Sequence, residues 1–276
     1  MGQRFLLIVT VFGVLLTTTF PAFAAVSPGA VQSVESLVGE RLTYDISFLW
    51  FKHLAEGSIR LERGEKLGTY LATMEARTRG FAAFVTRNRV EKYQTLMEVG
   101  PDGLLRPLVH SSQTFKGKGK DLREKKTSYT FDYLKRQVKY KKIKYHRITA
   151  DETLPLGTAG PVYDILSAFY NLRLGAFGSF AQQSIHMPTF YRKGVEEIVV
   201  TPMVDRNGKD GKFFAADGTL CKVLVDPSVF KTNGRELFVS FDKNNRLERG
   251  IIKNVIGLGD VKGVLRPDSV LKRVAD

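Results

Sequence analysis

The sequence predicts a mainly β protein: a curved antiparallel sheet, or an open β-barrel or half-barrel, of about twelve strands with one central α-helix at about 161–173. Short apolar runs separated by turn residues recur from residue 40 onward, which is the pattern of an antiparallel meander. Only one segment has helical spacing, and no linker or internal repeat divides the chain. We therefore expect one β-rich domain at 39–267, between a flexible segment at 25–38 and a C-terminal tail at 268–276.

The first 24 residues are typical of an export signal. Arg4 supplies a positive charge, residues 5–20 are apolar apart from small or hydroxyl side chains, and residues 22–24 form an A-x-A cleavage site. A membrane-spanning helix is the alternative, but it needs about 20 apolar residues and Pro21 ends this run earlier. No cysteine directly follows the cleavage site to carry a lipid, and no later run is long enough to span a membrane. The prediction is a signal peptide at 1–24, cleaved near Ala24, and a periplasmic protein.

The strands before residue 116 are predicted from alternation. Leu42, Tyr44, Ile46 and Phe48 alternate with polar residues, which gives one buried and one wetter face. Gly100-Pro101-Asp102-Gly103 is a clear turn between two later runs. Further strands are predicted at 57–63, 69–78, 90–99 and 104–115.

A basic stretch that follows is predicted to be a hairpin. Tyr129, Phe131 and Tyr133 alternate with polar residues, and the alternation resumes from Val138 after a turn at 134–137. A disordered basic tail would not carry aromatic residues at period two. We expect a hairpin with one aromatic face and one cationic face.

One helix is expected in the middle of the chain. Apolar residues from Val162 to Tyr170 recur at i, i+3, i+4, i+7 and i+8, the spacing of one helical face. Pro161 suits the first helical position, Asp164 lies in the first turn, and Arg173 lies near the end. After this helix, strands are predicted at 183–191, 196–204, 211–216, 221–226, 235–242, 247–255 and 260–266.

The charge is concentrated in the predicted hairpin. The chain has 42 Lys and Arg against 28 Asp and Glu, a net charge of +14. Residues 116–147 hold thirteen basic and three acidic residues, which leaves a local net charge of +10. Nucleic acid is the usual partner of such a block, but an exported protein meets anionic lipid, lipopolysaccharide and acidic glycans instead. We therefore expect one of these partners and no nucleic acid.

No catalytic, metal or cofactor motif is recognisable. Residues 205–211 resemble a calcium loop, but Lys209 occupies the fifth position and no glutamate the twelfth, so a hairpin turn is favoured. The four histidines form no closely spaced pair, and no G-x-S-x-G motif is present. The single cysteine, Cys221, lies in an apolar run typical of a buried strand. The sequence predicts neither an enzyme nor a cofactor.

The hairpin is the strongest candidate binding site. Clustered lysines bind phosphate or carboxylate groups, and neighbouring aromatic rings contact sugars or lipid glycerol regions. A solvated strand face is the alternative, because lysine often protects edge strands. The many aromatic residues of the strands fit either a filled core or an apolar groove inside a curved sheet. The candidate ligand-binding residues here are Lys125, Lys126, Lys139, Lys141, Lys142, Lys144, Tyr140 and Tyr145.

Several segments together resemble an exported bacterial family, the domain of unknown function 3108. Residues 39–46 read G-E-R-L-T-Y-D-I, close to the G-E-x-L-x-Y opening of that family, and 164–173 resemble its D-x-L-S-x-x-Y-x-x-R helix. Residues 90–93 and 103–107 are similar to its central strands. Glu56, in place of a small residue, departs from the pattern, as does the lack of a tryptophan at 238–242.

This resemblance spans roughly residues 39–266 and implies a periplasmic β-rich protein without an established activity. The motif includes Arg173, which either pins the helix to a strand or holds an anionic ligand at the mouth of the sheet. We expect a non-enzymatic envelope protein that binds a lipid or a lipopolysaccharide-like ligand through an apolar groove and the basic hairpin. The alternative is a structural module that docks an envelope assembly or an acidic polysaccharide. The oligomeric state stays open.

Overall fold

The computed structural model describes residues 33–48, 51–158, 160–178, 182–191, 194–206 and 210–267, without the side chains of residues 51 and 52. The predicted signal peptide and C-terminal tail lie outside these residues. Among the described helices, none has the length and apolar character needed to cross a membrane.

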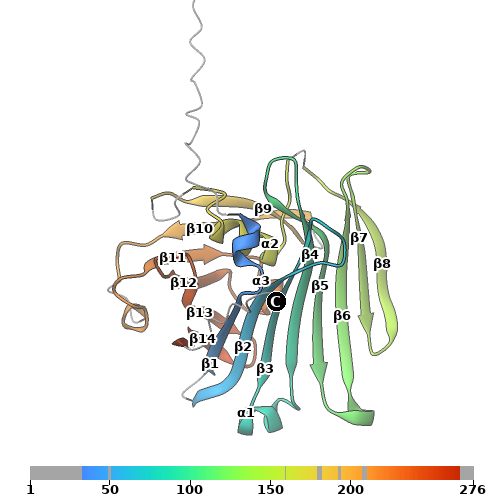
Figure 1. Cartoon of the computed structure of the whole chain (residues 1–276). Coiled ribbons are helices and arrows are strands. Elements are labelled where there is room, and N and C mark those ends of the chain that lie inside the picture. The colour runs from blue at the N-terminus through green and yellow to red at the C-terminus, as the bar shows by residue number, and fades with distance from the viewer. Residues whose placement is uncertain are drawn as a thin grey trace, which may run out of the picture.

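One 14-stranded antiparallel sheet forms the framework of the described chain (Figure 1). Strands β1 to β8 follow each other as a meander, β9 to β14 form a second meander, and β1 pairs with β14 to join them. The edges are therefore β8 and β9. The strands are β1 (Arg41–Phe48), β2 (Phe51–Arg63), β3 (Thr69–Thr78), β4 (Val90–Val99), β5 (Leu105–Lys116), β6 (Arg123–Asp132), β7 (Gln137–Lys144), β8 (Arg147–Pro155), β9 (Ile185–Tyr191), β10 (Gly194–Pro202), β11 (Thr219–Leu224), β12 (Glu236–Phe241), β13 (Leu247–Val255) and β14 (Gly259–Leu265).

The mainly β, antiparallel prediction is confirmed, but the count of about twelve strands is too low. Strand β8 was missed because its side chains are largely polar and exposed, so it lacks an apolar alternation. A strand was also predicted at 211–216 where the structure has none, because Gly211–Phe213 forms a 3-10 helix, η3. The predicted hairpin at 124–145 is confirmed as β6 and β7.

Helix α2 (Ile165–Arg173) begins four residues later than the predicted 161. Asp164 is its N-cap: the carboxylate accepts hydrogen bonds from Leu166 N and Ser167 Oγ, while Asp164 N donates to Ser167 Oγ. The residue before, Tyr163, pairs with Thr189 of β9 instead of entering the helix. The capping residues therefore override the apolar spacing that starts at Val162.

The remaining helices are short: α1 (Gly80–Val85), α3 (Pro227–Phe230), η1 (Val34–Leu37) and η2 (Gly119–Asp121). Val34 and Leu37 of η1 are buried in a core cluster with Leu42, although the sequence placed them in a flexible segment.

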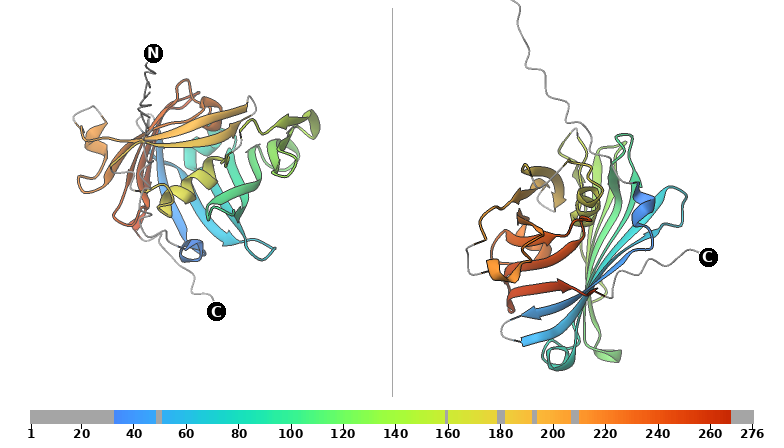
Figure 2. Two further views of the ribbon diagram at one scale, coloured as in Figure 1. Left: turned by 90° about the horizontal axis from the view of Figure 1, so that it is seen from above. Right: turned by 60° about the vertical axis from the view of Figure 1, so that its left-hand side comes forward.

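Helix α2 lies in the concavity of the curved sheet (Figure 2). One side of the helix, including Leu166 and Tyr170, joins a cluster from β1 to β5. The other side, including Ala168 and Leu172, joins a cluster from β9 to β12. The helix therefore fills the space between the two meanders and fixes where the remaining hollow of the sheet can lie.

Candidate functional site: a cationic cavity

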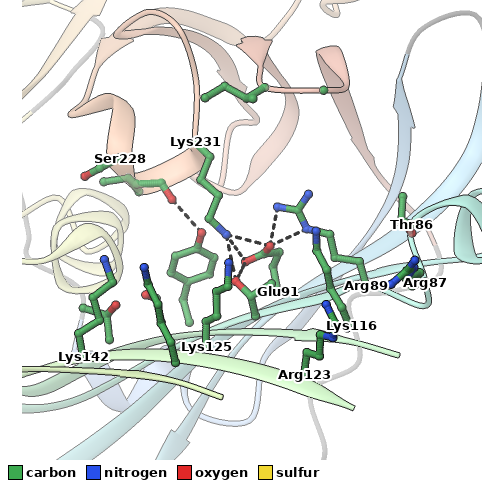
Figure 3. A pocket seen from close by; sticks show the side chains of 18 of the residues that line it. Thr86, Arg87, Arg89, Glu91, Lys116, Arg123, Lys125, Lys142, Ser228 and Lys231 are labelled. Atoms are coloured by element: carbon green, nitrogen blue, oxygen red, sulfur yellow. Dashed lines mark hydrogen bonds and ion pairs between the residues drawn. The ribbon is translucent and has the colours of Figure 1, made fainter. Parts of the chain in front are cut away.

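A cavity of about 1510 Å³ lies over the inner face of β4 to β7 (Figure 3). The inner faces of these four strands form its floor, and α3 with residues 256–258 forms its roof. The start of α2 and the end of β9 close one end of the cavity, and residues 84–88 line the other end. We call the exposed end, near α1 and the β5–β6 loop, the rim, and the buried end, near α2, the deep end.

Strands β6 and β7 place three of their six lysines in this cavity. In the antiparallel register Lys125 faces Lys144 and Tyr129 faces Tyr140, so these residues share the inner face. Five of the predicted site residues line the cavity: Lys125, Lys142, Lys144, Tyr140 and Tyr145.

The other hairpin lysines lie on the outer face. Lys126 pairs with Ile143 and Lys141 with Ser128, one residue out of phase with the inner set. Lys139 and Lys141 both lie near Asp151 of β8, at Nζ to carboxylate distances of 3.9 and 3.8 Å. The sequence grouped Lys126, Lys139 and Lys141 with the inner lysines, and the register of the hairpin separates them. The predicted division into an aromatic and a cationic face is wrong for the same reason, since tyrosines and lysines share the inner face.

Along the inner face of β6 the side chains change from charged to apolar. From the rim inward Arg123, Lys125, Thr127 and Tyr129 line the cavity, and the first two are exposed. Phe131, next on this face, is buried in a core cluster with Val138 and Phe190 and does not line the cavity. The inner face of β7 shows the same change. From the rim inward its side chains are Lys144, Lys142 and then Tyr140, which is 2% exposed. The cavity is therefore amphipathic along its length.

Aromatic rings make up much of the deep end. The Tyr129 ring lies 5.3 Å from that of Tyr140 and 6.0 Å from that of Phe190, measured between centroids. Buried Tyr191 lines the cavity near Phe190, and buried Tyr93, level with Thr127 in the register of β4 to β6, lines its middle. Such rings offer apolar faces together with hydroxyl groups.

A buried histidine–carboxylate pair also lies at the deep end. His110 Nδ1 is 3.0 Å from Asp164 Oδ1, and Thr95 Oγ1 donates to the same oxygen at 2.6 Å. Burial alone would raise the pKa of Asp164, but the charge of His110 and the hydrogen bonds from His110, Thr95 and Leu166 N outweigh it, so the pKa is lowered. The carboxylate thereby connects α2 to β4 and β5.

The rim, by contrast, brings like charges together. Burial, with the nearby charges of Arg89 and Lys125, lowers the pKa of Lys116. The Lys125 ammonium lies 5.5 Å from the centroid of the Tyr145 ring. An anion bound here would meet several ammonium and guanidinium groups at once.

The roof is fastened to the floor by Lys231, which follows α3. Its ammonium donates to both carboxylate oxygens of Glu91 at 2.9 Å and to Thr114 Oγ1 at 3.0 Å. Burial raises the pKa of Glu91, but the positive charges of Lys231 and then Arg89 lower it by more. The pKa of Glu91 is therefore below its usual value. Tyr93 also donates to the Val229 carbonyl at 2.8 Å. These bonds join the two meanders across the cavity.

Arg173 does not line the cavity. It is 2% exposed, and its guanidinium forms an ion pair with Glu40, which precedes β1; Nη2 lies 3.0 Å from Glu40 Oε1. Of the two roles open to it from the sequence, this geometry fits pinning the helix to a strand.

Metal and thiol chemistry find little support in the described residues. They contain no cluster of three or more His, Cys, Asp or Glu side chains suited to a metal. Cys221 is fully buried, and burial raises the pKa of its thiol to about 12.

Sequence reasoning missed several residues of the cavity. Period-two alternation in β5 could have identified His110, Ser112, Thr114 and Lys116 as one face, because they occupy every second position. Nothing in the sequence indicated Lys231, which reaches Glu91 from 140 residues later in the chain.

Comparisons with protein-family models, with curated proteins and with solved structures found no match to this chain.

Proposed function

We propose that the protein binds an anionic amphiphile, with the charged group at the rim of the cavity and the apolar part at the deep end. The observation that carries this proposal is the change along the cavity-lining face of β6 and β7, from Arg123, Lys125 and Lys144 at the rim to Tyr129 and buried Tyr140 at the deep end. An amphiphile has the same change from charged to apolar along its length.

The rim favours a phosphate or carboxylate group. Lys125 and Lys144 occupy directly opposed positions on neighbouring strands, and like charges so placed destabilise the sheet. A bound anion offsets this repulsion and forms charge-assisted hydrogen bonds with the ammonium groups. Rim charges thus supply both affinity and selection against neutral ligands.

The volume favours a ligand of lipid size. Sites for small molecules are typically about 300–1,000 Å³, and this cavity measures about 1510 Å³. Together with the predicted signal peptide and the resemblance to an exported family, this supports a periplasmic protein that binds a phospholipid or a lipopolysaccharide fragment.

We propose no reaction for the cavity. A histidine oriented by a carboxylate can act as a general base, but Asp164 also accepts from Thr95, Ser167 and Leu166 N. These bonds give the His110–Asp164 pair a structural role, capping and anchoring α2.

Titration calorimetry with dihexanoyl phosphatidic acid as a monomer tests the binding proposal. We expect the acid to bind more tightly than both inorganic phosphate, which lacks the chains, and dihexanoyl phosphatidylcholine, which is neutral. Thr127→Trp should block the middle of the cavity, whereas Ser128→Trp, on the outer face of the same strand, should bind normally. Equal binding by these two variants would contradict the proposal.

A second candidate uses the outer face. Lys126, Lys139 and Lys141 lie there on neighbouring strands, next to edge strand β8. These lysines suit an acidic polysaccharide, although Asp151 partly neutralises two of them. Binding of polygalacturonate that is lost in Lys126→Glu/Lys139→Glu would favour this candidate.

A further inference from the structure

Helix α1 exposes the apolar side that a helix in a folded protein normally buries. Phe81, Phe84 and Val85 lie at i, i+3 and i+4 on one helical face, and they are 72, 81 and 61% exposed. Ala82, beside this face, is buried. A small helix is thus held by its alanine while its large apolar side chains project from the protein.

The helix is held firmly in this orientation. Thr86 Oγ1 donates to the Ala82 carbonyl at 2.6 Å, and Arg79 N donates to the Leu54 carbonyl of β2 at 2.8 Å. Thr86 Oγ1 also donates to Thr78 Oγ1 of β3 at 3.0 Å, so residues at both ends of α1 are bonded to the sheet.

Other exposed apolar residues lie at the same end of the sheet, where Figures 1 and 2 show α1 beside the β5–β6 loop. Gly117 N in that loop donates to the Arg87 carbonyl at 2.6 Å, and Tyr145 N donates to the Glu124 carbonyl at 2.9 Å. Leu122 and Tyr145 in these segments are exposed. The rim of the cavity is therefore one connected surface with projecting apolar groups.

Basic residues surround these groups. Segments 80–88, 117–123 and 144–147 contain a single acidic residue, Asp121. Their basic residues are Arg87, Lys118, Lys120, Arg123, Lys144 and Arg147. Apolar side chains set among cations match the boundary of an anionic bilayer, where apolar groups enter the acyl region and cations meet phosphate groups.

We propose that this rim docks on the surface of an anionic lipid bilayer, with Phe81, Phe84 and Val85 inserted and the surrounding basic residues on the headgroups. The inference rests on the proposed function and extends it, because docking would place the mouth of the cavity against the membrane that supplies or receives the ligand. Phe84, Val85 and Tyr145 line the cavity as well as the rim, so the same residues would border the path of the lipid.

Co-sedimentation with vesicles of phosphatidylglycerol and phosphatidylcholine tests this docking. We expect binding that weakens as salt is raised, and binding at least about tenfold weaker for Phe81→Ser/Leu122→Ser, because this variant loses two exposed apolar side chains of the rim that do not line the cavity. The matched control is Leu67→Ser/Leu134→Ser. It removes two exposed leucines from turns at the ends of β3 and β6 that lie away from the rim. Every variant has the same N-terminal residues, so a difference in vesicle binding between variants comes from the substituted residues.

Docking is contradicted if the Phe81→Ser/Leu122→Ser variant sediments with vesicles as the control does, or if pure phosphatidylcholine vesicles bind equally well. The same variants are titrated with monomeric dihexanoyl phosphatidic acid, which we expect both to bind. Loss of vesicle binding with this titration intact supports docking. A wild-type protein that fails to bind the monomer would overturn the proposed function, and the vesicle comparison would still decide docking by itself.

Discussion

The two ends of the cavity differ in how their charges are balanced. At the deep end Asp164 is buried, lies 3.0 Å from His110 and accepts three further hydrogen bonds. At the rim Arg123 and Lys125 are exposed on one strand, and Lys116 nearby has its pKa lowered by burial, Arg89 and Lys125. Removing one partner of a buried ion pair strongly destabilises a fold because the other charge stays buried and unpaired, whereas clustered like charges weaken a fold unless an anion binds. The contrast supports the proposal that the rim holds the charged group of the ligand, whereas the His110–Asp164 pair at the deep end anchors α2.

The largest expected effect is at the deep end. Asp164→Ala removes the N-cap of α2 and leaves His110 and Thr95 without their shared acceptor, so we expect the free energy of unfolding to fall by about 4 kcal/mol. Urea denaturation measures this change. Asp121→Ala at the rim should stay within about 0.5 kcal/mol of the wild type. Equal effects at the two positions would remove the distinction between the ends.

The far end of α2 provides the next test. Arg173→Gln leaves Glu40 buried without its ion-pair partner and should cost about 3 kcal/mol in urea denaturation, with binding of dihexanoyl phosphatidic acid unchanged. Arg63→Gln is the control, because its pair with Glu35 is exposed and such pairs contribute about 0–1 kcal/mol. If a folded Arg173→Gln variant no longer bound the ligand, Arg173 would have a role in ligand binding and not only in stability.

A smaller effect is expected where the roof meets the floor. The folded protein lowers the pKa of Glu91 below 4.5, so its ion pairs contribute full stability above that pH and lose it as the pH falls through the folded value. Glu91→Gln should cost about 1 kcal/mol at neutral pH and little below the folded pKa. Urea denaturation of both proteins across this acidic range would show the convergence. A constant difference would contradict the assignment.

The smallest effect is expected at Lys116, where the pH dependence of binding changes and the stability does not. Its lowered pKa means that the ammonium loses its proton earlier than a free lysine as the pH rises. Because an anion binds the charged form, affinity for dihexanoyl phosphatidic acid should be full below this pKa and decline above it. Lys116→Arg, which stays charged, should flatten the decline in calorimetric titrations. The same pH profile in both proteins would contradict a role for Lys116.

Period-two alternation predicted most strands, because burial of one face leaves a clear pattern. It failed for β8, where an exposed edge strand needs no apolar side. It also failed for the start of α2: Asp164 and Ser167 cap a helix that begins at Ile165, three residues after Val162 starts the apolar pattern.

The site was predicted only in part. The basic hairpin was identified, yet its division into inner Lys125 and outer Lys126 depends on which face the curved sheet turns inward. Lys231 and Glu91 come together through the pairing of β1 with β14 and the resulting fold of one meander over the other. Such long-range pairing leaves no local trace in the sequence.

The most direct test of the central claim compares two variants with the same change in net charge. Lys125→Glu/Lys144→Glu reverses two inner charges, and Lys126→Glu/Lys139→Glu reverses two outer charges of the same hairpin. Calorimetric titration with dihexanoyl phosphatidic acid should show at least about a hundredfold loss of affinity for the inner variant and no more than about twofold for the outer variant. Equal losses would mean that only the overall charge matters, and would contradict a binding site inside the cavity.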